Sequence, residues 1–387
     1  MELEIMKKLY RITTIPLSLE KLLGSQLTFI NQHYKVTAVA AEPLELKRVA
    51  EQLHVDYETV DMTRKITPLQ DFKALIQLYR LLKRDRPEIV HTHTPKAGIV
   101  GMLAAKLAGV PIRMHTVAGL PLMEAQGLKR KILDFVEKLT YACATHVYPN
   151  SKGLADFILQ EKLTHSRKIK IIANGSSNGI DTAYFSPSVI PPQTMQDLRT
   201  ELQITSEDFV FVFVGRLVGD KGINELVKAF SQLQTPNTKL LLVGPLESDL
   251  DPLLPETLKM IQHPNIIHVG YQQDVRPYFA IANALVFPSY REGFPNVVMQ
   301  AGAMGLPSIV SNINGCNEII IDQENGIIIP VKDTKAILNA MTTLLEEPEL
   351  YQHLQKNSRS MICDRYEQKV VWNALLEEYN MLTSSLK

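Results

Sequence analysis

The chain has 387 residues, and because single cores stop growing near ~250–300 residues, two domains are expected. Hydrophobic residues make up 45% and charged residues 21%, which excludes a disordered chain. Basic and acidic residues number 41 each, but residues 1–185 hold 26 basic and 18 acidic residues, whereas residues 186–387 hold 15 and 23. The asymmetry predicts two functional halves. One interpretation is that the basic half binds phosphates, nucleic acid or an anionic membrane. The alternative is that the asymmetry reflects only an uneven distribution of charge over a solvated surface.

Membrane and secretory segments are not found in the sequence. No run of about 18 apolar residues occurs, and the first residues lack the basic, apolar and small-residue segments of a secretory signal. Cys143, Cys316 and Cys363 are far apart and form neither a metal-ligand motif nor a disulfide framework. We therefore expect a cytoplasmic protein and leave open a peripheral contact with the cytoplasmic face of the inner membrane.

Short apolar runs alternate with helical patterns along both halves. The predicted strands are Leu9–Ile15, Val36–Ala41, Glu88–His93, Pro111–Val117, Ile169–Ala173, Phe209–Val214, Lys239–Val243, Ile266–Val269, Ala284–Phe287 and Ser308–Val310. The predicted helices are Leu69–Arg84, Ala97–Ala108, Leu128–Tyr141, Ile223–Leu233, Val275–Ala282, Pro295–Met304 and Thr334–Leu345. This alternation predicts parallel sheets made from βαβ units.

The polar, proline-rich stretch Ser186–Pro192 is the predicted linker between two doubly wound domains with a cleft between them. The expected domains are residues 1–185 and 186–370, followed by a helix over residues 371–387. Ligands of such sheets bind beyond the carboxyl ends of the strands. The loops that follow the strands are therefore the expected sites.

Several common nucleotide-binding and hydrolase motifs are absent from the sequence. No G-x-x-x-x-G-K-[ST] motif occurs, which argues against a P-loop enzyme. The segment Thr14–Ser18 follows the first predicted strand where a G-x-G-x-x-G motif would stand, which argues against a nicotinamide or flavin enzyme. The H-E-x-x-H and G-x-S-x-G motifs are absent too.

The first candidate site is Gly215–Gly222, with the sequence GRLVGDKG, which follows the strongest predicted strand and opens a helix. Arg216 and Lys221 place two cations beside a helix N-terminus, where the dipole and free N–H groups also favour an anion. A guanidinium can bind phosphate oxygens in a bidentate manner. The segment predicts a diphosphate site, with a solvated surface turn as the alternative.

The second candidate site is Pro288–Gln300, with the sequence PSYREGFPNVVMQ, which also follows a strand and opens a helix. Pro295 suits the first helical position. The helix amides attract an anion, and the Glu292 carboxylate just before them can accept hydrogen bonds from hydroxyls. This pairing predicts a site for a sugar attached to a phosphate, and the alternative makes Glu292 only a partner of the helix dipole.

Histidines lie near the carboxyl ends of two strands of the first half, in HTHTPKAG at 91–98 and RMHTVAG at 113–119. His91 and His93 share one face of the sheet if the strand continues through both. A buried structural role is the commoner one for such histidines, and no further metal ligands are evident. His115, at a strand end beside a glycine-containing loop, is the stronger functional candidate.

In their order and spacing, these segments resemble the retaining glycosyltransferases of family four, which have the GT-B architecture. The resemblance is strongest over Gly215–Gly222 and Pro288–Gln300, and the sequence AGAMGLP at 301–307 continues the second motif. Asn178–Asp181 resembles the end of the family's first domain. The segments His91–Gly98 and Val110–Pro121 resemble bacterial enzymes that build capsule, O-antigen or glycoprotein glycans on a polyprenyl diphosphate carrier.

The resemblance implies an α/β fold with two Rossmann-like domains that face each other across a cleft. The first domain would bind the acceptor and the second the nucleotide sugar, and the helix over residues 371–387 would cross back to the first domain. The implied reaction moves a hexose or N-acetylhexosamine from a UDP-sugar to a polyprenyl-diphosphate-linked saccharide. It would proceed with retention and without a metal or other cofactor, and no nucleic-acid partner is expected.

The family's catalytic roles carry over onto matching residues. Arg216 and Lys221 would hold the donor diphosphate and neutralise it as it leaves. The family's Glu-x7-Glu motif falls on Glu292, which would contact the sugar hydroxyls near the anomeric carbon, and on Gln300. Gln300 keeps one carbonyl acceptor for the ribose where the family has a carboxylate. His115 would orient or hydrogen-bond the reacting groups.

Other donor contacts are expected from the same loops. Pro295 stands where many family members have glycine and removes one backbone donor, so neighbouring amides must supply the contacts. The segment Pro16–Gly24 lacks the family's paired glycines, which leaves open whether this loop contacts the donor phosphate. The expected donor-binding residues are Gly215, Arg216, Lys221, Tyr271, Glu292, Gly293, Phe294, Asn296, Val297 and Gln300.

Lys96 and His93 are the predicted acceptor-binding residues, with Lys96 on the carrier diphosphate. Gly127–Leu139 is an amphipathic helix that either binds anionic lipid or packs on the sheet with Lys129–Lys131 solvated. Two other functions stay open. A UDP-sugar 2-epimerase of similar architecture would convert donor without acceptor, and a non-catalytic carbohydrate- or lipid-binding homologue would bind donor without turnover.

Overall fold

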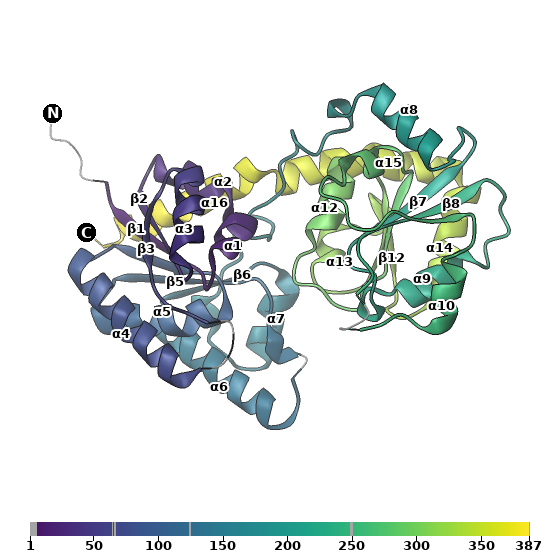
Figure 1. Cartoon of the computed structure of the whole chain (residues 1–387). Helices are drawn as coiled ribbons and strands as arrows, with labels where there is room; N and C mark the ends of the chain where they lie inside the picture. Colours follow the sequence, from purple (N-terminus) through teal and green to yellow (C-terminus); the bar gives the residue numbers. More distant parts are fainter. Residues whose placement is uncertain (1–5, 64, 66, 124, 248–250, 387) are drawn as a thin grey trace. The chain divides into compact units, whose positions relative to one another are not determined.

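The computed structural model describes residues 6–63, 65, 67–123, 125–247 and 251–386 (Figure 1). The chain divides into two compact units: unit 1 is Met1–Gly179 with Gln368–Lys387, and unit 2 is Ile180–Glu367. Each unit has a six-stranded sheet in which all neighbouring strands pair in parallel. The predicted α/β fold with two doubly wound sheets is therefore confirmed. No helix within the described ranges combines the length and hydrophobicity needed to cross a bilayer.

The sheet of unit 1 has the strand order β3-β2-β1-β4-β5-β6. Its strands are β1 (Lys8–Ile12), β2 (Lys35–Ala40), β3 (Asp56–Thr59), β4 (Ile89–Thr92), β5 (Ile112–Val117) and β6 (His146–Pro149). Its helices are α1 (Pro16–Ser18), α2 (Ser25–Asn31), α3 (Pro43–Leu53), α4 (Pro68–Asp85), α5 (Pro95–Ala108), α6 (Gly127–Cys143), α7 (Lys152–Gln160) and α16 (Gln368–Ser384). Shorter helical segments are η1 (Leu19–Leu23), η2 (Pro121–Met123) and η3 (Ser166–Lys168).

Two hydrophobic cores cover the two faces of this sheet. Side chains alternate along a strand, so Tyr10 and Ile12 of β1 pack with α4, α5, α6 and α7. Leu9 packs on the opposite face with α2, α3 and α16. Helix α16 is held by the Trp372 indole, which donates to Asn178 Oδ1 at 2.7 Å. The last helix therefore completes the core of unit 1.

The sheet of unit 2 has the strand order β12-β11-β10-β7-β8-β9. Its strands are β7 (Phe209–Val214), β8 (Thr238–Val243), β9 (Ile266–His268), β10 (Ala284–Phe287), β11 (Ser308–Ser311) and β12 (Gly326–Ile329). Its helices are α8 (Pro192–Glu201), α9 (Ile223–Phe230), α10 (Pro255–Met260), α11 (Arg276–Ala280), α12 (Asn296–Ala303), α13 (Cys316–Ile319), α14 (Thr334–Glu346) and α15 (Pro348–Tyr366), with short segments η4 (Pro187–Val189) and η5 (Gly219–Lys221).

Both sheets reverse their strand order beside their first strand. In unit 1, β1 lies between β2 and β4, and in unit 2, β7 lies between β8 and β10. Ligands of open α/β sheets bind at such a switch point, outside the carboxyl ends of the strands. The loops after β7 and β10 carry Gly215–Gly222 and Pro288–Pro295, so both sequence motifs of unit 2 lie at its switch point.

The predicted strand Ile169–Ala173 is wrong. Only Ile169 is bridged, to Val147, and no strand forms there. Strands β3, β6 and β12 were not predicted, and each lies at the edge of its sheet. Strands β3 (Asp-Tyr-Glu-Thr) and β6 (His-Val-Tyr-Pro) have no continuous apolar run, whereas β12 (Gly-Ile-Ile-Ile) has one that was not recognised as a strand.

The segment Ser186–Pro192 is not a free linker, because it packs into unit 2. Ile190 is buried in the unit 2 core, and Arg359 of α15 donates to the carbonyl oxygens of Thr182 and Phe185, both at 2.9 Å. The division between the units accordingly falls at Gly179, before the predicted boundary at residue 185, and the last helix begins at Gln368 rather than at residue 371.

Candidate functional site

Two loops of unit 2 meet at the carboxyl ends of β7 and β10. Gly222, which ends η5, has a φ of 71°, and a Cβ atom there would lie 2.2 Å from the carbonyl oxygen of Pro288. Only glycine permits this backbone conformation together with so close an approach. The Tyr290 N–H also donates to the Asp220 carbonyl at 2.8 Å. The two motifs, 71 residues apart at Lys221 and Glu292, are thereby joined into one site.

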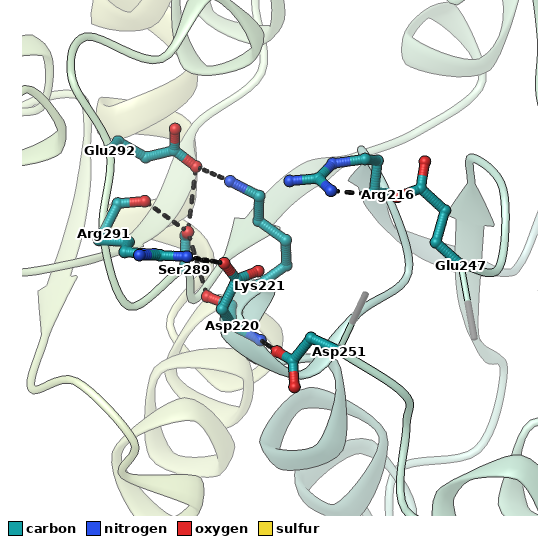
Figure 2. Close-up of polar contacts among 8 residues, drawn as sticks. All are labelled: Arg216, Asp220, Lys221, Glu247, Asp251, Ser289, Arg291 and Glu292. Carbon is teal, nitrogen blue, oxygen red and sulfur yellow. Dashed lines mark hydrogen bonds and ion pairs between the residues drawn. The ribbon is translucent and has the colours of Figure 1, made fainter. Parts of the chain in front are cut away.

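An ion pair between Lys221 and Glu292 forms the centre of this site (Figure 2). Lys221 Nζ lies 2.5 Å from Glu292 Oε1, and the two side chains are 16% and 17% exposed. The Ser289 hydroxyl lies 3.0 Å from the same carboxylate oxygen. Because the pair is largely shielded from water, its charges attract each other more strongly than an exposed pair would. The structure therefore brings two predicted site residues into direct contact.

Arg216 turns toward the next loop along the sheet (Figure 2). Its Nη1 donates to Glu247 Oε2, in the loop after β8, at 3.0 Å. Arg291 similarly donates to Asp220 Oδ2 at 2.8 Å. Arg216 and Lys221 thus both have a carboxylate partner before any ligand binds. An incoming anion would therefore meet cations that already have carboxylate partners.

Asp251 supports the turn that carries Lys221. Its Oδ2 accepts from the Asp220 N–H at 2.5 Å, and its carbonyl oxygen accepts from the Gly219 N–H at 3.1 Å. The residue has no role in the sequence-based prediction, and neither do Glu247 and Ser289. Within the described ranges, no group of three or more His, Cys, Asp or Glu side chains has the arrangement needed to hold a metal ion.

Helix α12 begins at Asn296, with Pro295 as its N-cap rather than its first helical residue. The first N–H groups of a helix have no acceptor within the helix, so Asn296 and Val297 present backbone donors beside Glu292. Asn314 fixes the preceding turn, because its Nδ2 donates to the Gly293 carbonyl at 2.5 Å. This end of α12 therefore carries the amide donors that the sequence predicts.

Gln300 lies one turn further along α12 and is half-buried. Residues four apart share a helix face, so Gln300 lies on the face that carries Asn296. Phe294 has a different position, because its ring packs 5.4 Å from that of Tyr366. Phe294, one of the predicted donor-binding residues, can thus contact a ligand only with its backbone, because its side chain packs against the core of unit 2.

Tyr271 follows β9, and its side chain is 74% exposed. Because neighbouring strands run in the order β10-β7-β8-β9, their loops carry Glu292, then Arg216, then Glu247, then Tyr271 along one edge of the sheet. The predicted donor residues therefore form a row rather than a compact cluster.

His93 belongs to a buried hydrogen-bonded network in unit 1. Arg11 Nε donates to His93 Nε2 at 3.1 Å, while His91 contacts the Tyr379 hydroxyl of α16 at 2.6 Å and the Thr116 hydroxyl at 2.7 Å. Burial, followed by the charge of Arg11, lowers the pKa of His91, and burial with the neighbouring His91 lowers the pKa of His93. Both histidines are therefore neutral and engaged with protein groups.

His115 lies within β5, two residues before the end of the strand, rather than at the strand end that the sequence predicted. It is inside β5, only 3% exposed, with Nδ1 2.8 Å from the Thr92 hydroxyl. Helix α5 covers the ring so closely that a Cβ atom on Gly98 would lie 2.6 Å from it. Burial lowers the pKa of His115 to about 4. His115 pairs with Thr92 of β4, and consecutive residues of a strand point to opposite faces of the sheet. His115 and His93 therefore lie on opposite faces.

Lys96 is at the start of α5, as predicted, at the switch point of unit 1. Its ammonium forms an ion pair with Asp71 of α4, and its side chain is 12% exposed. Asp71 also accepts from the Thr67 hydroxyl at 3.2 Å. Lys96 thus lies at the junction of strand and helix, where its ammonium already has a carboxylate partner.

Two glycosyltransferase family models match the chain. The model described as "Glycosyl transferases group 1" matches residues 194–361 and that described as "Glycosyl transferase 4-like domain" matches residues 29–175. The capsular polysaccharide biosynthesis glycosyltransferase CapM of Staphylococcus aureus is 31% identical over 378 residues, which cover 97% of both chains. The chain belongs to glycosyltransferase family four.

A further relative of this glycosyltransferase is the Escherichia coli UDP-Gal:alpha-D-GlcNAc-diphosphoundecaprenol alpha-1,3-galactosyltransferase. The two are 30% identical over 314 residues, 79% of this chain and 78% of the other. The crystal structure of HepE from Anabaena in complex with UDP and glucose matches with a TM-score of 0.76 at 18% identity, covering 97% of this chain and 100% of that one. The predicted family and the GT-B fold of this glycosyltransferase are therefore confirmed.

Proposed function

We propose that this glycosyltransferase moves a sugar from a UDP-sugar to a saccharide carried on a polyprenyl diphosphate in bacterial surface-glycan synthesis. The observation that carries the proposal is the Lys221–Glu292 ion pair at the switch point of unit 2. It combines a cation for phosphate with a carboxylate for sugar hydroxyls, beside the N-terminus of α12. The names of the relatives supply the substrate class, since the Escherichia coli enzyme is named for UDP-Gal and a diphosphoundecaprenol-linked acceptor.

Donor binding exchanges the partners of both cations. The diphosphate takes Lys221 from Glu292 and Arg216 from Glu247, because a single diphosphate carries two negative charges and can contact both cations at once. Glu292 is then free to accept hydrogen bonds from the sugar hydroxyls near the anomeric carbon, while Ser289 keeps its carboxylate in position. Recognition of the diphosphate and of the sugar is therefore coupled through one ion pair.

The rest of the donor extends along the edge of the sheet. The diphosphate and sugar lie between the loops after β10 and β7, with Gly215 and the backbone amides of Gly293, Asn296 and Val297 around them. The nucleoside extends toward Tyr271, which follows β9. Gln300 accepts from a ribose hydroxyl with its side-chain carbonyl. The row of loops suits an extended ligand of this kind.

The reaction needs stabilisation of charge on the departing UDP. The acceptor oxygen bonds to the anomeric carbon on the face from which the diphosphate leaves, the bond from that carbon to the phosphate oxygen breaks, and the leaving phosphate takes the acceptor proton. Retention of configuration follows. Arg216, Lys221 and the amides of α12 act on charge that develops only in the transition state. Because these charges belong to the protein, we propose a metal-independent reaction.

Unit 1 supplies the acceptor contacts in this proposal. Lys96 exchanges Asp71 for the carrier diphosphate at the carboxyl end of β4. His93 and His115 are buried, so we propose that they act as positioning residues, through Arg11 and Thr92 respectively, rather than by touching substrate. Their predicted contacts with the substrate are not part of the mechanism above.

A mass-shift screen tests the proposal. Purified protein is incubated with a panel of UDP- and GDP-sugars and a synthetic lipid-diphosphate-linked saccharide. We expect one UDP-sugar to increase the acceptor mass by one hexose or N-acetylhexosamine. Conversion of donor without acceptor would instead support a 2-epimerase, and donor binding with no product from any combination would support a non-catalytic homologue.

A further inference from the structure

An apolar groove lies over α5 in unit 1, between α4 and α6. It encloses about 610 Å³, within the ~300–1,000 Å³ typical of small-molecule sites. The groove belongs to unit 1, whereas the donor loops belong to unit 2. The groove is lined mainly by aliphatic and aromatic side chains, among them Phe72, Leu75, Ile99, Leu103, Ile132 and Val136.

The sequence of α5 explains why this groove is apolar. The helix places Gly98 and Gly101 against the sheet, where Cβ atoms would lie 2.6 Å from the His115 ring and 2.5 Å from Thr92 Cγ2. Its larger side chains Ile99 and Leu103, four residues apart, therefore lie on the outer face and remain half-buried. They form the floor of the groove, while Phe72 on one side is 60% exposed.

One end of the groove is polar and carries charge. The hydroxyls of Thr14 and Thr94, which follow β1 and β4, lie 2.7 Å apart, and the Lys96–Asp71 ion pair lies beside them in the groove lining. This end is the switch point of unit 1, where a ligand's reactive part is expected. The other acidic lining residue, Glu137, is buried, and burial raises its pKa, which favours the neutral form. The groove therefore matches a ligand with an anionic head and an apolar tail.

The apolar surface continues outward along the two flanking helices. Leu69 on α4 is 83% exposed, and Leu128 and Phe135 on α6 are 75% and 66% exposed. Lys129 and Lys131 are exposed on α6 as well. Exposed apolar side chains with cations on the same helix favour contact with an anionic lipid layer. A tail that leaves the groove would meet this surface next.

We propose that the groove holds the isoprenoid chain of the acceptor, with the carrier diphosphate at the Lys96 end. The identity of the acceptor rests on the proposed function; the groove itself rests on its shape, lining and charged end. From Pro95 to Leu103 the helix spans roughly 12 Å, at ~1.5 Å per residue. The groove therefore holds only the isoprene units nearest the diphosphate, and the remainder of the chain stays in the membrane.

Binding of two soluble diphosphates tests the groove directly. Farnesyl diphosphate and isopentenyl diphosphate carry the same head on a long and a short isoprenoid chain. Calorimetry with wild-type protein should give at least a tenfold tighter affinity for farnesyl diphosphate, since burial of each methylene contributes ~0.8 kcal/mol. The double variant Phe72→Gln/Ile132→Gln should lose about tenfold in farnesyl diphosphate affinity and none for isopentenyl diphosphate. Both positions are exposed, 60% and 45%, so the variant should fold.

Two control variants match these changes outside the groove. Leu44→Gln on α3 and Leu107→Gln on α5 replace leucines that are 86% and 57% exposed, and both should bind farnesyl diphosphate like the wild type. Equal affinity of the wild type for the two diphosphates would overturn the proposal. The proposal would also be overturned if the double variant lost binding to anionic vesicles that contain no isoprenoid but kept its affinity for farnesyl diphosphate. That result would indicate that the groove contacts the bilayer. If the wild type formed dimers and the double variant did not, the groove would hold a second copy of the chain, and the proposal would again be overturned.

Transfer assays separate this inference from the proposed function. With a saccharide on a long-chain polyprenyl diphosphate in mixed micelles, the double variant should raise KM about tenfold and keep kcat. With the same saccharide on a short alkyl diphosphate, it should match the wild type. Wild-type transfer with an unchanged KM in the double variant would refute the groove and leave the function standing. Chain-length-dependent diphosphate binding without transfer of any sugar would refute the function and leave the groove standing.

Discussion

Replacement of Lys221 by alanine removes one of the two cations assigned to the donor diphosphate. In the wild type its ammonium lies 2.5 Å from Glu292, and both side chains are largely buried. The variant leaves the Glu292 carboxylate with the Ser289 hydroxyl at 3.0 Å. Breaking a fully buried pair costs ~3–5 kcal/mol. Since this pair is partly exposed, we expect the free energy of unfolding to fall by about 1–3 kcal/mol.

The effect of Lys221→Ala on the reaction should be larger than its effect on stability. Loss of one preorganised donor to a developing anion costs roughly 3–4 kcal/mol, and each ~1.36 kcal/mol is tenfold in rate. We therefore expect kcat to fall by about two to three orders of magnitude. Arg216→Ala should act in the same direction. Donor affinity should change less than kcat, because part of the charge exists only in the transition state.

Initial rates and urea unfolding on the same protein samples measure both effects. Lys228→Ala on α9 is the matched control, because this lysine is exposed and has no role in the proposed site, and it should leave the rates unchanged. A soluble Lys221→Ala protein with wild-type kcat/KM would refute the diphosphate assignment. If the ion pair acts as one unit, Lys221→Ala/Glu292→Gln should be little worse than the more damaging single variant.

Gln300→Ala should weaken UDP binding by about 1–3 kcal/mol and Gln300→Glu should be tolerated; equal calorimetric affinities of wild type and Gln300→Ala would remove this residue from the site. Glu292→Gln should lower kcat more than donor affinity, and the reverse split would contradict its placement near the anomeric carbon. Activity should survive excess EDTA, whereas a loss that Mg²⁺ or Mn²⁺ restores would contradict a metal-independent reaction. Burial of His115 should lower the free energy of unfolding by about 3 kcal/mol as the pH falls from 6.5, the ordinary pKa of histidine, to about 4. Between these two values the imidazole binds a proton in the unfolded chain but not in the folded protein. If His115→Gln showed the same pH dependence of urea stability as the wild type, this reasoning would be refuted.

The central strands were predictable because both of their faces are buried. The structure places β7 at Phe209–Val214 and β10 at Ala284–Phe287, the same bounds that the apolar runs predict. Strand β3 reads Asp-Tyr-Glu-Thr and is exposed or half-exposed throughout, so neither periodicity nor hydrophobicity marks it. Its pairing with β2 is a long-range interaction that no local pattern records.

The candidate site was predictable only in part, for a related reason. Arg216, Lys221 and Glu292 follow strands directly, and the general rule about strand ends locates them. Their partners depend on which strands are neighbours in the sheet, so Glu247, 31 residues from Arg216, gives no signal by spacing alone. The burial of His115 could not be predicted, because the cover over its ring comes from Gly98 of α5.

Because helix α16 belongs to unit 1, the two units are completed in a different order from that in which they begin along the chain. Its Tyr379 hydroxyl accepts from Arg11 at 3.0 Å and contacts His91 at 2.6 Å, and its Glu378 carboxylate accepts from the Tyr148 hydroxyl at 2.8 Å. Unit 2 is one continuous stretch and can fold as soon as it leaves the ribosome. Unit 1 lacks one partner of the Arg11 guanidinium until residues 368–384 have been synthesised. A chain that ended after residue 367 would therefore contain all of the second unit and a first unit without the helix that packs against Arg11 and Tyr148.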